Sequence, residues 1–354
     1  MSIPTKQQAL AILTPQGAWG VITAGVDKPG PGEILVRVES TALNPIDWKV
    51  QATAYSAVLK EYPAILGSDS AGVVAAVGEG VTKFAVGDRV LHQGFFTNRL
   101  GTLKQYVIIY ADIVTKIPEN LTFDQAASVP LGLATAAIGL YNKRWESGGA
   151  ELVAPWKEGG RGKYAGQPIF IAGGSSSVGQ YVIQLAKLSG FSPIITTVSA
   201  HNNDLVKGLG ATHPIDRKLS DEEIVAAVKK ITPKPLKIVF DAISLKATQG
   251  FSVDVLSPGG KLVLVLNNAL PKERITGDKD VWTTYGTVHG ELNREFGAEM
   301  YSYITELLSS GDIKPNLTES LPGGLAAGIE GLRRLQNDEV SGRKLIVHPQ
   351  ETSG

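Results

Sequence analysis

Hydrophobic and polar positions change their pattern about a third of the way along the chain. Up to about residue 120, short runs rich in Val and Ile alternate with glycine-containing segments, as is typical of β-strands and their turns. These runs span 33–41, 71–78, 88–94 and 104–111. Proline and glycine alternate over 28–33, which predicts a turn leading into the first run. We therefore expect the first part of the chain to be rich in β-structure.

From about residue 131, strand patterns alternate with helical ones. An apolar strand at 166–174 precedes a helical stripe of apolar positions over 176–190. Ser220 and Glu223 form a capping box that opens another helix. Because strands and helices alternate with short connections, and the strands are almost continuously apolar, the pattern predicts a doubly wound parallel sheet. Further strands are expected at 192–199, 236–243, 260–266 and 343–349, and helices at 246–256 and 295–311.

Three segments have an unusual composition. The uncharged stretches 125–142 and 164–186 are long enough to span a membrane, but the first contains Pro130 and the second a polar GGSSS turn. We expect both to be buried in a globular fold. The segment 144–165 has an uneven Gly, Trp and Lys composition and is expected to be an exposed insertion.

Composition narrows the class of protein. The 354 residues are 43% hydrophobic and 19% charged, which suits about two globular domains. Thirty-four basic residues balance thirty-four acidic ones, so nothing favours nucleic acid or an anionic membrane as partner. The N-terminal sequence lacks the apolar run of a signal peptide, and a cytoplasmic location is expected.

The absence of cysteine removes several kinds of chemistry. It excludes disulfides, thiolate zinc sites, iron–sulfur clusters and a cysteine nucleophile. No two of the five histidines have a spacing suited to a shared metal ion, so we predict no metal site. A site of histidines and carboxylates drawn from distant segments stays open as an alternative.

The turn AGGSSSVG at 172–179 is the strongest candidate binding motif. A dinucleotide-binding turn needs small residues and a helix N-terminus directed at the pyrophosphate. Gly174, Ser176 and Gly179 occupy the three positions where small residues are needed, although glycine is commoner than serine at the second. An ordinary glycine-rich turn is the alternative, but this turn follows the first strand of a long βαβ series. The predicted cofactor contacts here are Gly173, Gly174, Ser175, Ser176, Ser177, Val178 and Gly179.

The end of the next strand bears on the choice between NAD and NADP. Ser199 stands where an NAD site places an acidic residue, and His201, Asn202 and Lys207 follow it. These groups suit a 2′-phosphate, and we predict NADPH as the cofactor. The alternatives are that His201 and Lys207 are solvated surface groups, or that Asp204 substitutes for the missing acid. The predicted cofactor set also includes Arg217, Ile243, Leu266 and Lys344.

Four motifs in order carry a family resemblance: NPIDWK at 44–49, the segment 67–90, the segment 172–187 and SGRKLIVHP at 341–349. Together they resemble the medium-chain dehydrogenase/reductase superfamily, and most closely its zinc-free branch of quinone oxidoreductases and enoyl reductases. The run AHNNDLVKGLGA at 200–211 is similar to fungal stand-alone enoyl reductases, including those acting in trans with polyketide synthases.

The resemblance implies an α/β fold with two domains. A GroES-like β-barrel catalytic domain would comprise 1–130 and 291–354, and a doubly wound, Rossmann NADP-binding domain would comprise 131–290.

Departures from the zinc alcohol dehydrogenases point to the reaction. Asn44 stands where their catalytic-zinc cysteine falls, Gly67-Ser68-Asp69 replaces their GHE motif, and the four-cysteine lobe is missing. Without this Lewis acid, alcohol dehydrogenation is disfavoured, whereas reduction of a conjugated C=C bond needs a hydride, a donor to the enolate oxygen and a proton source. The prediction is therefore a zinc-independent, NADPH-dependent reductase of an α,β-unsaturated carbonyl: an enone, enal or enoyl thioester.

Two other functions stay open: an NADPH quinone oxidoreductase and a non-catalytic NADPH-binding protein. The expected substrate is a small-molecule or carrier-bound enoyl compound, and the resemblance makes a polyketide-synthase-like protein a candidate partner. The sequence leaves monomer and homodimer open.

The resemblance also supplies the catalytic candidates Lys49, Tyr55, Asn44 and Thr135. Lys49 could stabilise an enolate oxygen, with a surface position or a salt bridge to Asp47 as the alternative. Tyr55 is at about the distance where some enoyl reductases place a proton-donating tyrosine, but its neighbours do not reproduce their GxY pattern. Thr135 resembles a threonine near the nicotinamide or the substrate carbonyl, and helix packing explains it nearly as well. Asp69 is expected to be structural.

Overall fold

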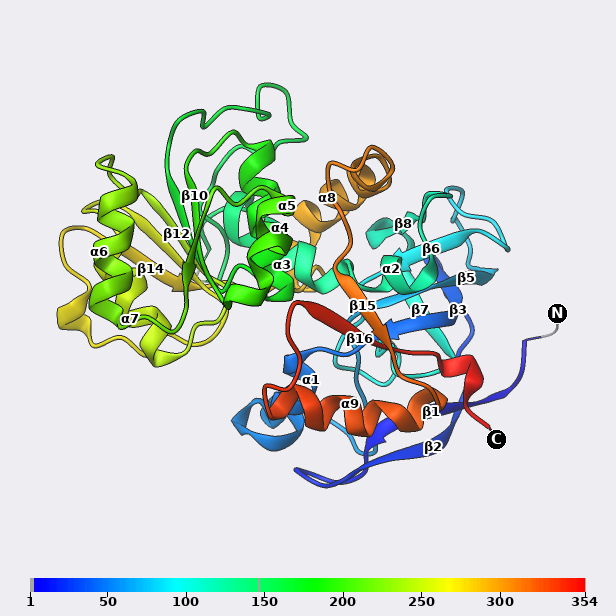
Figure 1. The fold of residues 1–354 in the computed structure, drawn as a ribbon. Coiled ribbons are helices and arrows are strands. Elements are labelled where there is room, and N and C mark those ends of the chain that lie inside the picture. Colours follow the sequence, from blue (N-terminus) through cyan, green and yellow to red (C-terminus); the bar gives the residue numbers. More distant parts are fainter. Residues whose placement is uncertain (1–2, 146, 354) are drawn as a thin grey trace. The chain divides into compact units, whose positions relative to one another are not determined.

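The computed structural model describes residues 3–145 and 147–353, and the chain divides into two compact units (Figure 1). The first unit comprises Met1–Leu131, Gly297–Ser309 and Pro315–Gly354, and the second comprises Gly132–Phe296 and Ser310–Lys314. The sequence placed its two boundaries at 130/131 and 290/291. The assignment of one unit to catalysis and the other to the cofactor stays a prediction.

The second unit is built on a six-stranded sheet in the order β11-β10-β9-β12-β13-β14. Every neighbouring pair is parallel. The first strand of the series, β9, lies at the centre, and successive strands add first to one side of it and then to the other. This is the doubly wound order that the sequence predicted. The strands are β9 (Ile169–Ala172), β10 (Ile194–Val198), β11 (His213–Asp216), β12 (Ile238–Asp241), β13 (Lys261–Leu264) and β14 (Asp280–Thr283).

Helices connect these strands, and their ends follow local sequence signals. Ser176 caps α4, its hydroxyl accepting from the Gly179 amide at 3.0 Å. The predicted capping box of Ser220 and Glu223 is confirmed at the start of α6. The connecting helices are α4 (Ser177–Leu188), η3 (Ala200–Asn202), α5 (Asn203–Leu209), α6 (Asp221–Ile231), α7 (Lys246–Val255) and η4 (Lys272–Arg274). α3 (Pro130–Tyr141) precedes β9, and α8 (Glu291–Ser309) follows β14, its residues from Gly297 on belonging to the first unit.

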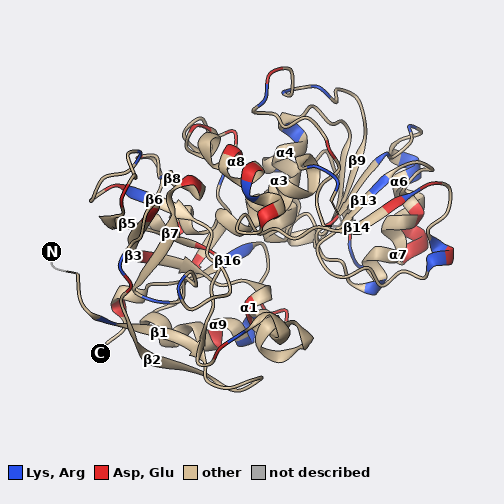
Figure 2. Ribbon diagram, turned by 180° about the vertical axis from the view of Figure 1, so that it is seen from behind, with Lys and Arg blue, Asp and Glu red and all other residues tan. Residues whose placement is uncertain are grey.

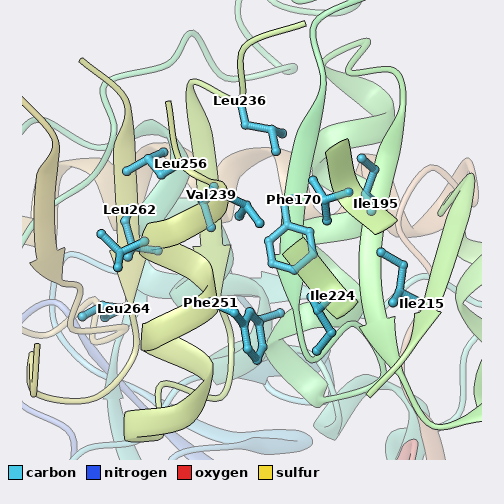
Figure 3. Packing of buried hydrophobic residues seen from close by; sticks show 14 residues of the cluster. Phe170, Ile195, Ile215, Ile224, Leu236, Val239, Phe251, Leu256, Leu262 and Leu264 are labelled. Carbon is cyan, nitrogen blue, oxygen red and sulfur yellow. The ribbon is translucent and has the colours of Figure 1, made fainter. Parts of the chain in front are cut away.

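One hydrophobic core lies between this sheet and the helices on one of its faces (Figure 3). Phe170 of β9 and Val239 of β12 are fully buried, and Phe251 of α7 meets Phe170 edge-on with the ring centroids 6.1 Å apart. Both faces of the sheet are covered, which is why its strands are almost continuously apolar.

The first unit contains two sheets, as its β-rich sequence predicted. One has the order β2-β1-β4, and the other has the order β15-β16-β3-β5-β6-β8, with β7 paired to β3. The strands are β1 (Lys6–Ile12), β2 (Trp19–Gly25), β3 (Glu33–Ala42), β4 (Ala64–Ile65), β5 (Ser70–Val77), β6 (Arg89–His92), β7 (Tyr106–Tyr110), β8 (Val114–Lys116), β15 (Leu317–Ser320) and β16 (Arg343–Val347).

Short helices and a second hydrophobic core complete this unit. Leu43, Leu332 and Leu345 are buried in that core, which Trp48 and Tyr55 cover in part. The helices are α1 (Pro45–Ala52), η1 (Ala54–Val58), η2 (Ala111–Ile113), α2 (Phe123–Ala127), η5 (Gly324–Ala326), α9 (Ala327–Gln336) and η6 (Pro349–Glu351).

The expectation for 144–165 is wrong in part. Ala150 and Ala154 are buried at 1% exposure, and Trp156 packs edge-on against Tyr141, because this segment returns over α3. Basic and acidic residues are mixed along the ribbon of both units, in keeping with the balanced charge (Figure 2). Among the described residues, no helix is long and apolar enough to cross a membrane.

Candidate active site

The glycine-rich turn connects β9 to α4 as predicted. Gly173 has a φ of +77°, a left-handed conformation that glycine adopts without strain. Its amide donates to Thr197 Oγ1 at 3.0 Å, and the Gly174 amide donates to the carbonyl oxygen of Thr197 at 3.1 Å. The turn is therefore fixed to the neighbouring strand β10.

The small residues of the turn are required by close packing within the unit. A Cβ added at Gly174 would lie 2.1 Å from Thr196 Oγ1, and one at Gly179 would lie 2.3 Å from the carbonyl oxygen of Gly173. Both distances are too short for any real side chain. Ser176 stands in the middle because its hydroxyl caps α4, which explains the departure from glycine there.

The parallel sheet brings most of the predicted cofactor residues to one edge. Because all six strands run the same way, the residues that follow them gather at the carboxyl edge, where open α/β sheets bind ligands. Ser199 follows β10, Arg217 follows β11 and Ile243 lies just after β12. Leu266 lies just after β13, and the Arg217 amide donates to the carbonyl oxygen of Val198 at 3.0 Å.

Of the other predicted residues, Ser199, His201 and Asn202 lie directly after β10, and Lys207 lies in the last turn of α5. Ser199 is half-buried and stands directly before η3, which contains His201 and Asn202. His201 and Lys207 are exposed, and Asn202 is buried. Arg217 is exposed as well. The side chains of His201 and Arg217, which follow β10 and β11, are therefore accessible to an anion at this edge.

Asp241, at the end of β12, organises this edge and was missed by the sequence interpretation. Its Oδ1 accepts from the Ser244 amide at 2.7 Å and from the Ile243 amide at 3.0 Å, and its Oδ2 accepts from Thr248 Oγ1 at 2.7 Å. Burial raises its pKa to about 6 in spite of these hydrogen bonds. The carboxylate thus fixes the loop whose Ile243 side chain packs against Gly173.

The first unit holds a buried polar cluster around Asn44, Asp69 and Lys344. The Lys344 ammonium donates to Asn44 Oδ1 at 2.5 Å and to Asp69 Oδ2 at 2.6 Å. Asn44 Nδ2 also donates to Asp69 Oδ2, at 2.9 Å. Lys344 is 4% exposed and Asp69 is fully buried. Lys344 was predicted to bind the cofactor, and the structure places its charge in this cluster; the cofactor contact stays a prediction.

Neighbouring backbone and side-chain groups complete the cluster. Asp69 Oδ1 accepts from the Leu131 amide at 2.6 Å, which places a carboxylate at the N-terminus of α3. Asp47 is fully buried beside Asn44, whose amide donates to Asp47 Oδ2 at 2.9 Å. Burial raises the pKa of Asp47 to about 7, and the nearby charge of Lys344 acts in the opposite direction.

The other three catalytic candidates lie on three different helices: Lys49 on α1, Tyr55 on η1 and Thr135 on α3. Lys49 lies in the last turn of α1, with its ammonium 5.6 Å from the ring centroid of Trp48, and burial lowers its pKa. No ion pair joins it to Asp47 among the described residues, so the proposed salt bridge is wrong. Tyr55 lies in η1, half-buried against the core of the first unit. Thr135 belongs to the second unit, in α3.

Thr135 is buried against the segment that follows β14. A Cβ added at Gly286 would lie 1.9 Å from Thr135 Oγ1, so only glycine fits opposite this hydroxyl. No local pattern predicts this pairing, because Thr135 and Gly286 are far apart along the chain.

Comparison with known proteins gives matches over both units. Residues 30–119 match the family model described as an alcohol dehydrogenase GroES-like domain, and residues 177–309 match the model described as zinc-binding dehydrogenase. The trans-enoyl reductase thnE of Trichoderma harzianum is 32% identical over 97% of this chain and 96% of its own length. The dehydrogenase orf1 of Aspergillus niger is 32% identical over 98% of this chain and 97% of its own length.

The solved structure of a quinone oxidoreductase from Coxiella burnetii has a similar fold. Its TM-score is 0.75 at 23% identity, covering 96% of this chain and 98% of that one. Together with the GroES-like match, this confirms the predicted fold class.

The residues around Asn44 and Asp69 do not suit a zinc ion. Zinc in proteins is held by Cys, His, Asp or Glu side chains, and this chain has no cysteine. Among the described residues, no group of three His, Asp or Glu side chains could hold a metal ion. Asn44 Oδ1 and Asp69 Oδ2 both accept from Lys344, so a metal ion would meet an ammonium at this place.

Proposed function

The chain belongs to the medium-chain dehydrogenase/reductase superfamily and is an oxidoreductase, and from this premise we propose that it reduces the C=C bond of an α,β-unsaturated carbonyl compound with NADPH, without zinc. The observation that carries the proposal is the position of the Lys344 ammonium. It donates to Asn44 Oδ1 and Asp69 Oδ2, so it occupies the place where a metal ion would bind these oxygens. Relatives that are named trans-enoyl reductases support the same choice.

The family uses a nicotinamide cofactor, and the carboxyl edge of the parallel sheet suits one. The turn after β9 is closely packed and directs the N-terminus of α4 outward from the strand, as a pyrophosphate requires. Two observations support NADPH over NADH. Ser199 supplies a hydroxyl where an acid would repel the 2′-phosphate, and the exposed Arg217 follows the adjacent strand β11.

Hydride transfer to a conjugated C=C bond needs no strong Lewis acid. When bound, a nicotinamide would supply the hydride for the β-carbon, and negative charge would then develop on the carbonyl oxygen of the substrate. In our proposal Lys49 or Thr135 donates a hydrogen bond to that oxygen, and Tyr55 delivers the proton to the α-carbon. Asn44 is assigned a supporting role, because its side-chain oxygen and nitrogen are both bound within the cluster.

The direct test measures NADPH consumption with three acceptors: an α,β-unsaturated carbonyl, a quinone and a saturated aldehyde. A saturated carbonyl product from the first acceptor alone is the expected result. Turnover with the quinone alone would contradict the proposal and indicate a quinone reductase instead. An alcohol product from the saturated aldehyde would contradict the argument from the missing metal site. Comparing a short soluble enoyl thioester with the same acyl group on a carrier protein tests whether the substrate is carrier-bound.

Variants of Lys49 and Tyr55 test their proposed roles. We expect Lys49→Met and Tyr55→Phe each to lower kcat about tenfold to a hundredfold at saturating NADPH, since each removes one donor to the reacting atoms. Lys116→Met is the matched control, because its ammonium pairs with Asp88 at the surface, at 2.8 Å. A variant with the full kcat would remove its residue from the mechanism.

Cofactor preference is tested by Ser199→Asp and Arg217→Ala. We expect both variants to raise the Kd for NADPH about tenfold, since one charge contact to a phosphate is worth roughly 1.5–3 kcal/mol. The Kd for NADH should fall or stay within about twofold of the wild-type value. Lys229→Ala, on the exposed face of α6, is the control for a general loss of positive charge. Unchanged discrimination in both variants would contradict the assignment of the 2′-phosphate site.

A further inference from the structure

We propose that Lys344 is a positioning residue: its buried ammonium fixes the Asp69 carboxylate and the Asn44 amide in one arrangement, and through Asp69 it sets the first turn of α3. The effect on catalysis rests on the proposed function, whereas the effect on α3 does not.

The strand order explains how these distant residues meet. β16, which carries Lys344, pairs with the end of β3, where Val347 lies opposite Thr41. β3 pairs in turn with β5, where Thr41 lies opposite Ser70. Asn44 follows β3 and Asp69 precedes β5. The pairing of β16, β3 and β5 therefore brings the side chains of Lys344, Asn44 and Asp69 together. No turn or helix spacing could do this, because Lys344 lies 300 residues from Asn44 and 275 from Asp69.

Both carboxylate oxygens of Asp69 are used, and for different partners. Oδ2 accepts from Lys344 and Asn44, and Oδ1 accepts from the Leu131 amide at 2.6 Å. Its backbone carbonyl accepts from Thr41 Oγ1 at 2.7 Å, which anchors the residue itself. The direction of Oδ1 therefore depends on what holds Oδ2. Among the described residues, Lys344 is the only cation that contacts Oδ2, and a charged donor binds a carboxylate more strongly than the Asn44 amide does.

The Lys344 ammonium supplies the counter-charge that the buried Asp69 carboxylate needs. Asp47 and Asp69 are both fully buried, and among the described residues Lys344 is the single cation paired with Asp69. Its charge also acts on Asp47, whose pKa it lowers against the effect of burial. Removing the ammonium would leave Asp69 buried without a counter-charge beside a second carboxyl group. Such a carboxylate takes up a proton or turns away, and either change weakens its bond to the Leu131 amide.

The consequence reaches a predicted catalytic residue. Leu131 is the second residue of α3, and its amide belongs to the first turn, whose N–H groups have no partner within the helix. Asp69 supplies that partner. Thr135 lies one turn further along the same helix, so the orientation of its hydroxyl depends on how the helix begins.

The test compares Lys344→Met with the wild type in hydrogen exchange, cofactor binding and turnover. We expect the amide of Leu131 to exchange at least tenfold faster, the Kd for NADPH to change less than threefold, and kcat at saturating cofactor to fall at least tenfold. A large rise in that Kd with an unchanged kcat would overturn the proposal and make Lys344 a cofactor ligand, as the sequence predicted. Unchanged exchange at Leu131 would overturn it as well.

A second variant keeps the proposal testable if Lys344→Met does not fold. Asp69→Asn combined with Lys344→Met removes both charges, so we expect its melting temperature to return to within about 5 °C of the wild type. An amide offers one acceptor oxygen in place of two, so Leu131 or Asn44 loses its partner. kcat should therefore stay at least tenfold low. Recovery of the full kcat would show that the pair contributes stability alone.

Controls separate this role from general effects. Lys104→Met removes another buried lysine of the same unit, whose ammonium donates to the carbonyl oxygens of Asn98 and Arg99. This variant should leave exchange at Leu131 unchanged. If the wild type reduces no unsaturated carbonyl, the proposed function fails. In that case the exchange measurement still decides whether Lys344 sets the start of α3.

Discussion

Replacing Gly179 by alanine tests how tightly the cofactor turn is constrained. The added methyl carbon would lie 2.3 Å from the carbonyl oxygen of Gly173, 2.9 Å from the Gly174 Cα and 3.0 Å from the Gly173 carbonyl carbon. All three contacts are with backbone atoms, which no side-chain rotation can relieve. The turn or the start of α4 must therefore move by more than half an ångström to accept the methyl group.

The size of the effect follows from what that movement breaks. Overpacking of this kind costs roughly 1–3 kcal/mol of folding stability. The Gly179 amide also bonds the cap residue Ser176, and a weakened N-cap costs about 1 kcal/mol more. Because the same turn holds the pyrophosphate in our proposal, we expect the Kd for NADPH to rise at least tenfold, or about 1.4 kcal/mol.

Gly208→Ala is the matched control for the same chemical change. It lies inside α5, and a Cβ added there would meet nothing within 4 Å. We expect it to gain up to about 1 kcal/mol, since alanine favours helices over glycine. Urea unfolding gives the two stabilities, and fluorescence titration gives the two cofactor affinities. A Gly179→Ala protein with wild-type stability and affinity would refute the argument from close packing.

Three further changes have defined outcomes. Burial raises the pKa of Asp47 from 3.8 to about 7, so the folded state holds this proton more tightly than the unfolded state does. The free energy of unfolding should therefore fall as pH rises from about 4 to 7, and Asp47→Asn should flatten that part of its pH profile. Burial lowers the pKa of Lys104 from 10.5 to about 8, so stability rises with pH across that window, and Lys104→Met should remove this rise. Arg161→Ala breaks an exposed ion pair with Asp312 and should cost less than about 1 kcal/mol in thermal or urea unfolding.

The elements that the sequence predicted well are those with strong local signals. The strand 33–41 appears as β3, and the helix 176–190 appears as α4 between its cap Ser176 and Gly190. In both, periodicity and end residues agree with the final fold. β14 was missed because it has only four residues, DVWT, within a polar stretch, and its conformation comes from pairing with β13.

The candidate site divides in the same way. The turn after β9 and Ser199 could be located because each is a local motif at the end of a strand. Asp241 could have been found by the same rule, since an acidic residue directly follows the apolar run of β12. Thr135 against Gly286 carries no such signal, because the contact depends on where the chain returns after β14.

The cluster of Lys344 with Asn44 and Asp69 shows why some site chemistry cannot be derived from spacing. Each residue has an ordinary local interpretation: a helix cap, a residue directly before a strand, and a lysine near the start of a strand. Only strand pairing brings them together. Burial then makes each charge depend on its partner, which the sequence alone does not indicate. Lys344 was predicted to contact the cofactor, and no motif indicated that its ammonium lies between Asn44 and Asp69. The residue types that exclude a metal ion were visible in the sequence, whereas the ammonium in their midst follows from the fold.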